Sequence, residues 1–215
     1  MENNSEISEN LALKRKILEI LSETYKGSET ALQFDSVFQL LVAVMLSAQT
    51  NDNQVNKITD KLFIDHGTPQ AIAKMTENQL ESYIRTCGLY KNKTKNIINT
   101  ARIILEDFHG RVPESREELM KLPGVGRKTA NVVISVGFGE PALAVDTHVY
   151  RVAHRLGLSD STTPLMVEED LCRFIPREDW GNAHHWLIWH GRKICNAINP
   201  KCASCPLKDL CPSRQ

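Results

Sequence analysis

The chain has 215 residues, 41% hydrophobic and 24% charged, which is enough for one large domain or two small ones with cores of their own. Lysine plus arginine equals aspartate plus glutamate, at 26 each, so the net charge gives no support for nucleic-acid binding and any such site must be a local patch. No apolar run is long enough to span a bilayer, and the polar start Met1-Glu2-Asn3-Asn4 has no signal pattern, so we expect a cytoplasmic protein.

Apolar residues recur at helical spacing, and turn residues interrupt them at intervals of about one helix length. The first predicted helix has one apolar face, formed by Leu13, Ile17, Leu21 and Tyr25. Residues 37–46 are apolar nearly all round, which predicts a buried central helix. Helix boundaries and caps are predicted at Thr68-Pro69, Thr76 with Gln79, Gly88, Gly110, Ser115 with Glu118, and Thr163-Pro164, with a last long helix over 181–194. Strand signals are nearly absent, so the predicted fold class is all-α.

A tight turn connects two predicted helices, 117–122 and 127–136, in the middle of the chain. Its sequence, Pro123-Gly124-Val125-Gly126, has two glycines one residue apart, which permit unusual backbone conformations and close approach by a ligand. The amides that begin the second helix lack helical partners and can bind a phosphate. A plain helical hairpin in which glycine only caps a helix explains these residues equally well.

Four of the six cysteines crowd the C-terminal end, with the spacing Cys195-x6-Cys202-x2-Cys205-x5-Cys211. Four thiolates can hold one tetrahedral metal or a cubane cluster, and their clustering argues against a disulfide framework. The spacing alone does not decide between zinc and iron–sulfur. Cys87 and Cys172 stand apart, and we expect them to be small buried residues.

Several motifs in fixed order resemble the helix-hairpin-helix DNA glycosylase superfamily, and within it the bacterial endonuclease III family. They run from Leu46-Ser-Ala-Gln49 through Gly88-Leu-Tyr90, Leu122-Pro-Gly-Val-Gly-Arg-Lys-Thr-Ala130 and Val145-Asp-Thr-His148 to the terminal cysteines. The resemblance implies two helical lobes with a DNA cleft between them. A six-helix barrel domain with the helix-hairpin-helix would span 30–140, and an iron–sulfur cluster domain would combine 1–29 with 141–215.

The resemblance also implies a bifunctional DNA glycosylase and abasic-site lyase of base excision repair that acts on oxidised pyrimidines. Lys128 would attack C1′ of the damaged nucleotide, expel the base and form a Schiff base, and β-elimination would then nick the strand. Asp146 matches the family's catalytic carboxylate. A carboxylate favours the ammonium form of a neighbouring lysine, so Asp146 is expected to accept a proton or to balance charge on the sugar. Without the family, Lys128 would be a solvated lysine and Asp146 an N-cap.

In the family, the terminal cysteines Cys195, Cys202, Cys205 and Cys211 hold a [4Fe–4S] cluster, for which we expect a structural role. Gln49 and Leu89 match residues that fill the gap left by a flipped nucleotide, although either could simply end a helix. We expect further DNA contacts at the hairpin residues Gly124, Val125 and Gly126 and at His148.

Three lysines, Lys91, Lys93 and Lys95, lie at the start of a predicted helix, where the helix dipole disfavours positive charge. Phosphate contact and a solvated helix face explain them about equally well. The expected partner is duplex DNA with damaged bases or abasic sites, bound by a monomer that associates with the nucleoid. The rivals are an adenine-mismatch or pyrimidine-dimer glycosylase, and a DNA-binding module without catalysis.

Overall fold

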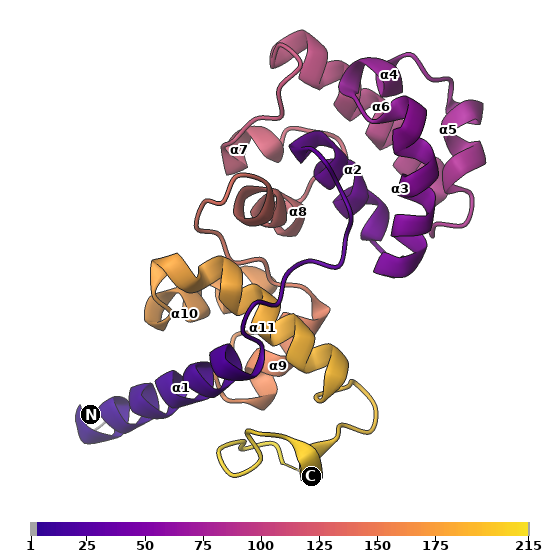
Figure 1. Ribbon diagram of the computed structural model, residues 1–215. Coiled ribbons are helices and arrows are strands. Elements are labelled where there is room, and N and C mark those ends of the chain that lie inside the picture. The colour runs from indigo at the N-terminus through magenta and orange to yellow at the C-terminus, as the bar shows by residue number, and fades with distance from the viewer. Residues whose placement is uncertain (1–3, 215) are drawn as a thin grey trace. The chain divides into compact units, whose positions relative to one another are not determined.

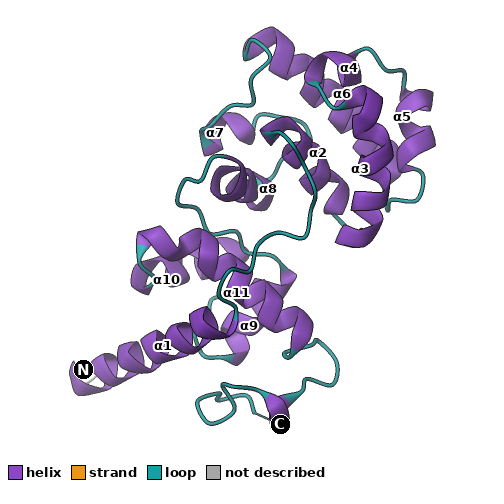
Figure 2. Ribbon diagram, in the orientation of Figure 1, coloured by secondary structure: helices purple, strands orange, loops and turns teal. Residues whose placement is uncertain are grey.

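The structure is a computed structural model that describes residues 4–214, with side chains from residue 8 onward. The first three residues of the polar start therefore lie outside the described residues. By its internal contacts the chain divides into two compact units, Met1–Thr30 with Pro141–Gln215 and Ala31–Glu140 (Figure 1). Every regular element among the described residues is a helix, which confirms the predicted all-α class (Figure 2). No helix in this part of the chain is long and apolar enough to cross a membrane.

The unit Ala31–Glu140 is built around α2 (Val37–Ser47), whose side chains from Phe38 to Met45 are almost all buried. It packs against α3, α6, α8 and the π-helical segment η1. This confirms the buried central helix expected from its apolar sequence. The other helices of the unit are α3 (Asp52–His66), α4 (Pro69–Ala73), α5 (Glu77–Ile84), α6 (Tyr90–Asp107), α7 (Arg116–Leu119), α8 (Arg127–Val132) and η1 (Val133–Gly137).

Local capping chemistry begins most of these helices as predicted. The Thr68 hydroxyl accepts the Ala71 amide ahead of Pro69, and Thr76 forms a reciprocal capping box with Gln79. At α7 only half of the expected box is present. The Ser115 hydroxyl accepts the Glu118 amide, but it donates to the Glu118 carboxylate itself.

The two helices around the hairpin are shorter than predicted. α7 ends at Leu119 because the next residues form a turn, in which Leu122 donates its amide to Leu119 O. Pro123 disfavours helical backbone at Leu122, so the helix cannot continue. α8 ends at Val132 and the chain proceeds as the π-helical η1, where Gly137 lies directly against Val37 and Leu40.

The other unit consists of α1 (Asn4–Thr24), α9 (Thr147–Arg155), α10 (Pro164–Phe174), the 3₁₀ turn η2 (Arg177–Asp179), α11 (Trp180–Lys193) and the 3₁₀ turn η3 (Cys202–Ser204). Ile17 and Leu21 of α1 are fully buried in its core, together with Val149 of α9 and Leu187 of α11. Helices α9 and α11 approach closely at Gly191, where a Cβ atom would lie 3.1 Å from the Cβ of His148. The cysteine-rich segment follows α11 directly.

Candidate functional site

The hairpin is held from inside the unit Ala31–Glu140. Val125 donates its amide to Leu122 O at 3.1 Å, and its side chain is buried. Gly124 adopts φ +77°, a conformation that side chains rarely tolerate, and a Cβ there would lie 2.7 Å from Nδ2 of Asn96 on α6. One helical turn later, the Thr100 hydroxyl donates to Pro123 O at 3.1 Å. Helix α6 therefore fixes the turn, and the side chain of Val125 serves as an anchor.

The two hairpin glycines differ in their conformational need. Gly124 is strained for any other residue, as predicted, but Gly126 has φ −93° and open space around it. The prediction that the turn needs glycine at both positions was therefore wrong for Gly126, because its backbone conformation is one that any residue adopts. Gly126 begins α8 and accepts the Ala130 amide, and Lys128 follows, partly buried, in the first turn. The first amides of an α-helix lack partners within the helix, and Gly126 adds no side chain that would cover them.

Gln49 and Leu89, which are 40 residues apart in the sequence, come from loops that touch. Both have left-handed backbone, with φ +58° and +57°, and both side chains are exposed. Gly88 makes the contact possible, because a Cβ at that position would lie 3.2 Å from Gln49 O and 3.4 Å from its Cβ. Left-handed backbone at a non-glycine residue costs about 1–3 kcal/mol and persists only where the surroundings impose it.

Both explanations offered for Lys93, the phosphate contact and the solvated helix face, are wrong. Its side chain is only 7% exposed, and its ammonium donates to Leu46 O at 2.8 Å, Ala48 O at 2.5 Å and Thr50 Oγ1 at 3.3 Å. These acceptors lie at the C-terminal end of α2, where carbonyl groups lack helical partners and the dipole favours a cation. Burial lowers the pKa of Lys93 from its ordinary value. Lys91, in contrast, is exposed and remains accessible to a phosphate.

Asp146 is the N-cap of α9 in the unit Met1–Thr30 with Pro141–Gln215, so it and Lys128 belong to different units. Its carboxylate accepts the amides of His148 and Val149, both at 2.8 Å and both on Oδ1. The half-buried His148 has a pKa lowered mainly by burial, and its Nδ1 lies 3.2 Å from the Arg151 guanidinium. The structure confirms the N-cap that the sequence offered as the alternative role of Asp146. In the described structure this cap engages only one oxygen of the carboxylate.

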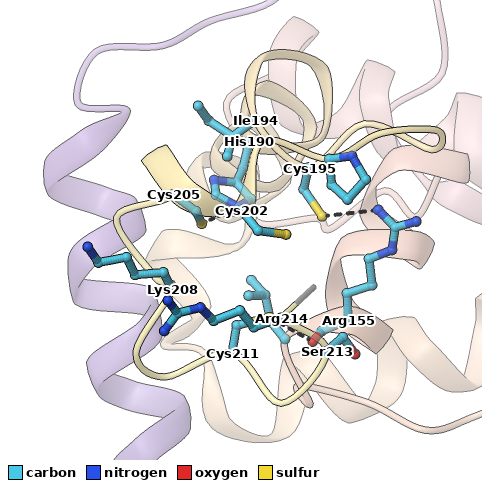
Figure 3. Close-up of a pocket in the computed structure, with 12 residues that line it drawn as sticks. Arg155, His190, Ile194, Cys195, Cys202, Cys205, Lys208, Cys211, Ser213 and Arg214 are labelled. Carbon is cyan, nitrogen blue, oxygen red and sulfur yellow. Dashed lines mark hydrogen bonds between the residues drawn. The ribbon is translucent and has the colours of Figure 1, made fainter.

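All four C-terminal cysteines line one cavity, which Figure 3 shows in close-up. The Arg155 guanidinium at the end of α9 reaches Cys195 Sγ at 3.5 Å and Asn196 O at 2.6 Å. One turn earlier, Arg151 donates to Cys195 O at 3.1 Å and Gly191 O at 3.0 Å. Two arginines of α9 therefore tie down the start of the cysteine segment.

A second set of contacts reaches the cavity from the core. His190 is 1% exposed, and its Nε2 lies 3.7 Å from Cys205 Sγ while its Nδ1 lies 3.0 Å from the Tyr25 hydroxyl of α1. Burial lowers the pKa of His190 to about 4. Burial, followed by the nearby Cys205 and Cys195 sulfurs, raises the pKa of Tyr25 to about 12. Burial also raises the thiol pKa of Cys205 and Cys211.

The cysteine sulfurs surround the cavity without converging on one point. Among the side chains that the structure describes, residues 8–214, no group of three or more His, Cys, Asp or Glu is placed to hold a single metal ion. A single tetrahedral zinc would draw its sulfurs to roughly 3.8 Å from one another, given Zn–S bonds of about 2.3 Å. Cys87 is buried in the other unit, and Cys172, a partly buried residue of α10, packs against the hydrophobic core of its own unit, so neither adds to the four.

Several residues of these sites were missed by the sequence analysis. Asn96, Thr100 and Arg155 act through partners 23 or more residues away, and no local pattern identifies such partners. Arg151 and Arg155 offered one signal, because they lie one turn apart on a helix that begins with the candidate carboxylate. Tyr25 was identified only as an apolar position of the first helix, and His190 only falls within the last predicted helix, 181–194.

Comparison with known proteins identifies a family. Residues 42–177 match the model of the HhH-GPD superfamily, described as base excision DNA repair proteins. Endonuclease III of Haemophilus influenzae is 48% identical over 205 residues, which cover 94% of this chain and 97% of that protein.

Two solved structures have the same fold over nearly the whole chain. One is a trapped endonuclease III–DNA covalent intermediate, with a TM-score of 0.89 and 46% identity over 93% of this chain and 96% of that one. The other is a non-covalent endonuclease III–DNA complex, with a TM-score of 0.90 and 43% identity over 99% of this chain and 97% of that one.

The difference between the two hairpin glycines can be measured. We expect Gly124→Ala to lower the free energy of unfolding by about 1–3 kcal/mol, because the new Cβ imposes left-handed strain and meets Asn96. Gly126→Ala is the matched control, and we expect it to change stability by less than about 1 kcal/mol, because its backbone suits alanine. Denaturant titration of both variants measures the two changes in the free energy of unfolding. Equal losses of stability would contradict the conclusion that only Gly124 requires glycine.

Proposed function

The chain belongs to the HhH-GPD superfamily of base excision DNA repair proteins, and from this premise we propose that it is a bifunctional DNA glycosylase and abasic-site lyase. It removes oxidised pyrimidines from duplex DNA through a lysine Schiff base and nicks the strand by β-elimination. The observation that carries the proposal is the likeness, over almost the whole chain, to a structure in which endonuclease III is covalently trapped on DNA. We also propose that it works as a cytoplasmic monomer, on the DNA of the nucleoid.

Lys128 is the proposed nucleophile. Its neutral amine forms a bond to C1′ while the bond from C1′ to the base breaks. Loss of a proton from the attached amine and breakage of the C1′–O4′ bond then open the sugar ring and give the Schiff base, which allows loss of a C2′ proton and departure of the 3′ phosphate. Only the neutral amine attacks, so bound DNA has to exclude water from the side chain. The position of Lys128 in the first turn of α8, partly buried beside the hairpin, supports this role.

Asp146 is the proposed carboxylate partner. Both of its capping bonds end on Oδ1, so Oδ2 is available to accept a proton or to face a positively charged sugar. The cap also fixes the direction of the carboxylate, so the structural and chemical roles support one another. The half-buried His148 beside it is the proposed wall of the pocket.

The proposed DNA-binding residues divide by their chemistry. The main chain at Gly124, Val125 and Gly126 would approach the phosphate backbone, with the donors coming from the glycines, since the Val125 amide is engaged within the turn. Lys91 adds an exposed charge. Gln49 and Leu89 would fill the space that a flipped nucleotide leaves, for which their exposed side chains on rigid backbone are suited.

The four C-terminal cysteines, Cys195, Cys202, Cys205 and Cys211, are proposed to hold a [4Fe–4S] cluster. The donor set fits such a group, because four thiols line one cavity, and a cubane binds four thiolates, each through a different iron. When bound, the cluster supplies iron–sulfur bonds that cross-link the segment after α11. The Leu207 amide at 3.4 Å from Cys205 Sγ and the guanidinium of Arg155 near Cys195 would stabilise negative charge on the sulfurs.

The nucleophile assignment is tested by borohydride trapping on abasic DNA. We expect Lys128→Ala to lower the rate of covalent trapping at least about 1000-fold while the variant still binds the DNA. Lys74→Ala removes an exposed lysine of the same unit and is expected to be trapped like the wild type. Trapping of Lys128→Ala at the wild-type rate would exclude this lysine as the nucleophile.

Two substitutions of Asp146 separate its chemical role from its role as the N-cap of α9. Asparagine caps a helix as well as aspartate does, so Asp146→Asn should keep the wild-type melting temperature while base removal slows by about 10²–10⁴-fold. Asp146→Ala loses the cap as well and should also be about 1 kcal/mol less stable. Single-turnover glycosylase rates and thermal unfolding of the two variants provide the comparison, and wild-type turnover in Asp146→Asn would rule out the chemical role.

The metal assignment has a direct chemical readout. We expect the purified protein to be brown and to contain about four irons and four sulfides per chain. Cys205→Ser should lose the visible absorbance, whereas Cys87→Ser, a buried cysteine of the other unit, should keep it. A colourless protein loaded with zinc would overturn the assignment.

A further inference from the structure

Lys93 is the one lysine among residues 8–214 whose side chain is buried. Burying an ammonium group is unfavourable unless its donors are satisfied, and here three donors meet three acceptors. None of the reactions assigned above uses this group. Its location therefore requires an explanation of its own.

The acceptors lie on both sides of Gln49. Leu46 O and Ala48 O precede it, and Thr50 Oγ1 follows it. Gln49 itself has φ +58°, which requires constraint from its neighbours. The ammonium group supplies that constraint, because any change in the backbone at Gln49 displaces at least one of the three oxygens.

The main chain of the same residue reaches the second exposed side chain. The Lys93 amide donates to Leu89 O at 3.1 Å, in the first turn of α6, where Leu89 also has left-handed backbone at φ +57°. Lys93 thus contacts the Leu89 loop through its backbone and the Gln49 loop through its side chain. Gly88, packed against Gln49, closes the arrangement.

We propose that Lys93 is a positioning residue that presents Gln49 and Leu89 to duplex DNA as one rigid pair. The inference rests on the proposed function, since it concerns how this enzyme keeps a gap open after a nucleotide is flipped. A pair fixed in advance loses little conformational entropy when it enters the helix, so it fills the gap at lower cost. Lys93 touches neither the substrate nor the nucleophile, and its effect is confined to steps that need an intact opposite strand.

The test compares one abasic oligonucleotide as a single strand and as a duplex. A single strand has no opposite base and no gap to fill, so the pair is not needed there. We expect Lys93→Met to lower the single-turnover rate of borohydride trapping on the duplex at least about tenfold, since small displacements of positioning groups have effects of this size or larger. On the single strand the rate should stay within about twofold of wild type.

Two further variants make the result specific. Thr50→Val removes only the third acceptor and should show a smaller loss in the same direction, on the duplex alone. Lys61→Met, a matched change at an exposed lysine of α3, should leave both rates unchanged. Thermal unfolding, followed by circular dichroism, confirms that each variant is folded at the assay temperature.

The outcomes separate this inference from the proposed function. Wild-type protein that is trapped on neither DNA would overturn the lyase function itself. Normal wild-type trapping, with Lys93→Met equally impaired on both DNAs, would reduce Lys93 to a general structural role and overturn the positioning role. An unimpaired duplex rate in Lys93→Met would overturn it as well.

Discussion

The buried ammonium group of Lys93 is the constraint on which the proposed DNA-facing surface of the unit Ala31–Glu140 depends. It sits on α6, and the same helix carries Asn96 and Thr100, which hold the hairpin one and two turns further on. Both loops proposed to touch DNA are therefore attached to one helix. Because α6 is itself buried along Ile97, Ala101 and Ile104, neither loop can move without disturbing the core.

Helix α9 has the corresponding role in the other unit. Asp146 caps its first turn, and Arg151 and Arg155 of its later turns bind the carbonyls around Cys195. The proposed catalytic carboxylate and the start of the cysteine segment are thus fixed to opposite ends of one short helix. Ordering of that segment by a metal cluster would then stabilise the helix that displays the carboxylate, which is a sufficient reason for a structural cluster in a repair enzyme.

The features that were predictable from the sequence are those decided by neighbouring residues. The apolar face of α1, the buried α2 and the caps at Thr68, Thr76 and Thr163 depend on local spacing and were correct. The sequence shows Lys93 as an unusual positive charge at a helix start. Its hydrogen-bond partners are 43 to 47 residues away, so its burial against them could not be predicted from local spacing. The same holds for His190 and Tyr25, which are 165 residues apart and meet only in the fold.

The balanced charge of the chain acquires a physical meaning from this arrangement. A protein with as many acidic as basic residues has no net positive charge to attract phosphate, so its affinity for DNA has to come from a few well-placed groups. We propose that main-chain amides at Gly124 and Gly126 and the uncharged side chains of Gln49 and Leu89 are such groups. Each gains affinity only if its geometry is set before DNA arrives. Left-handed backbone at Gly124, Gln49 and Leu89 sets that geometry, with strain at the two residues that are not glycine, and side chains of α6 keep it from relaxing.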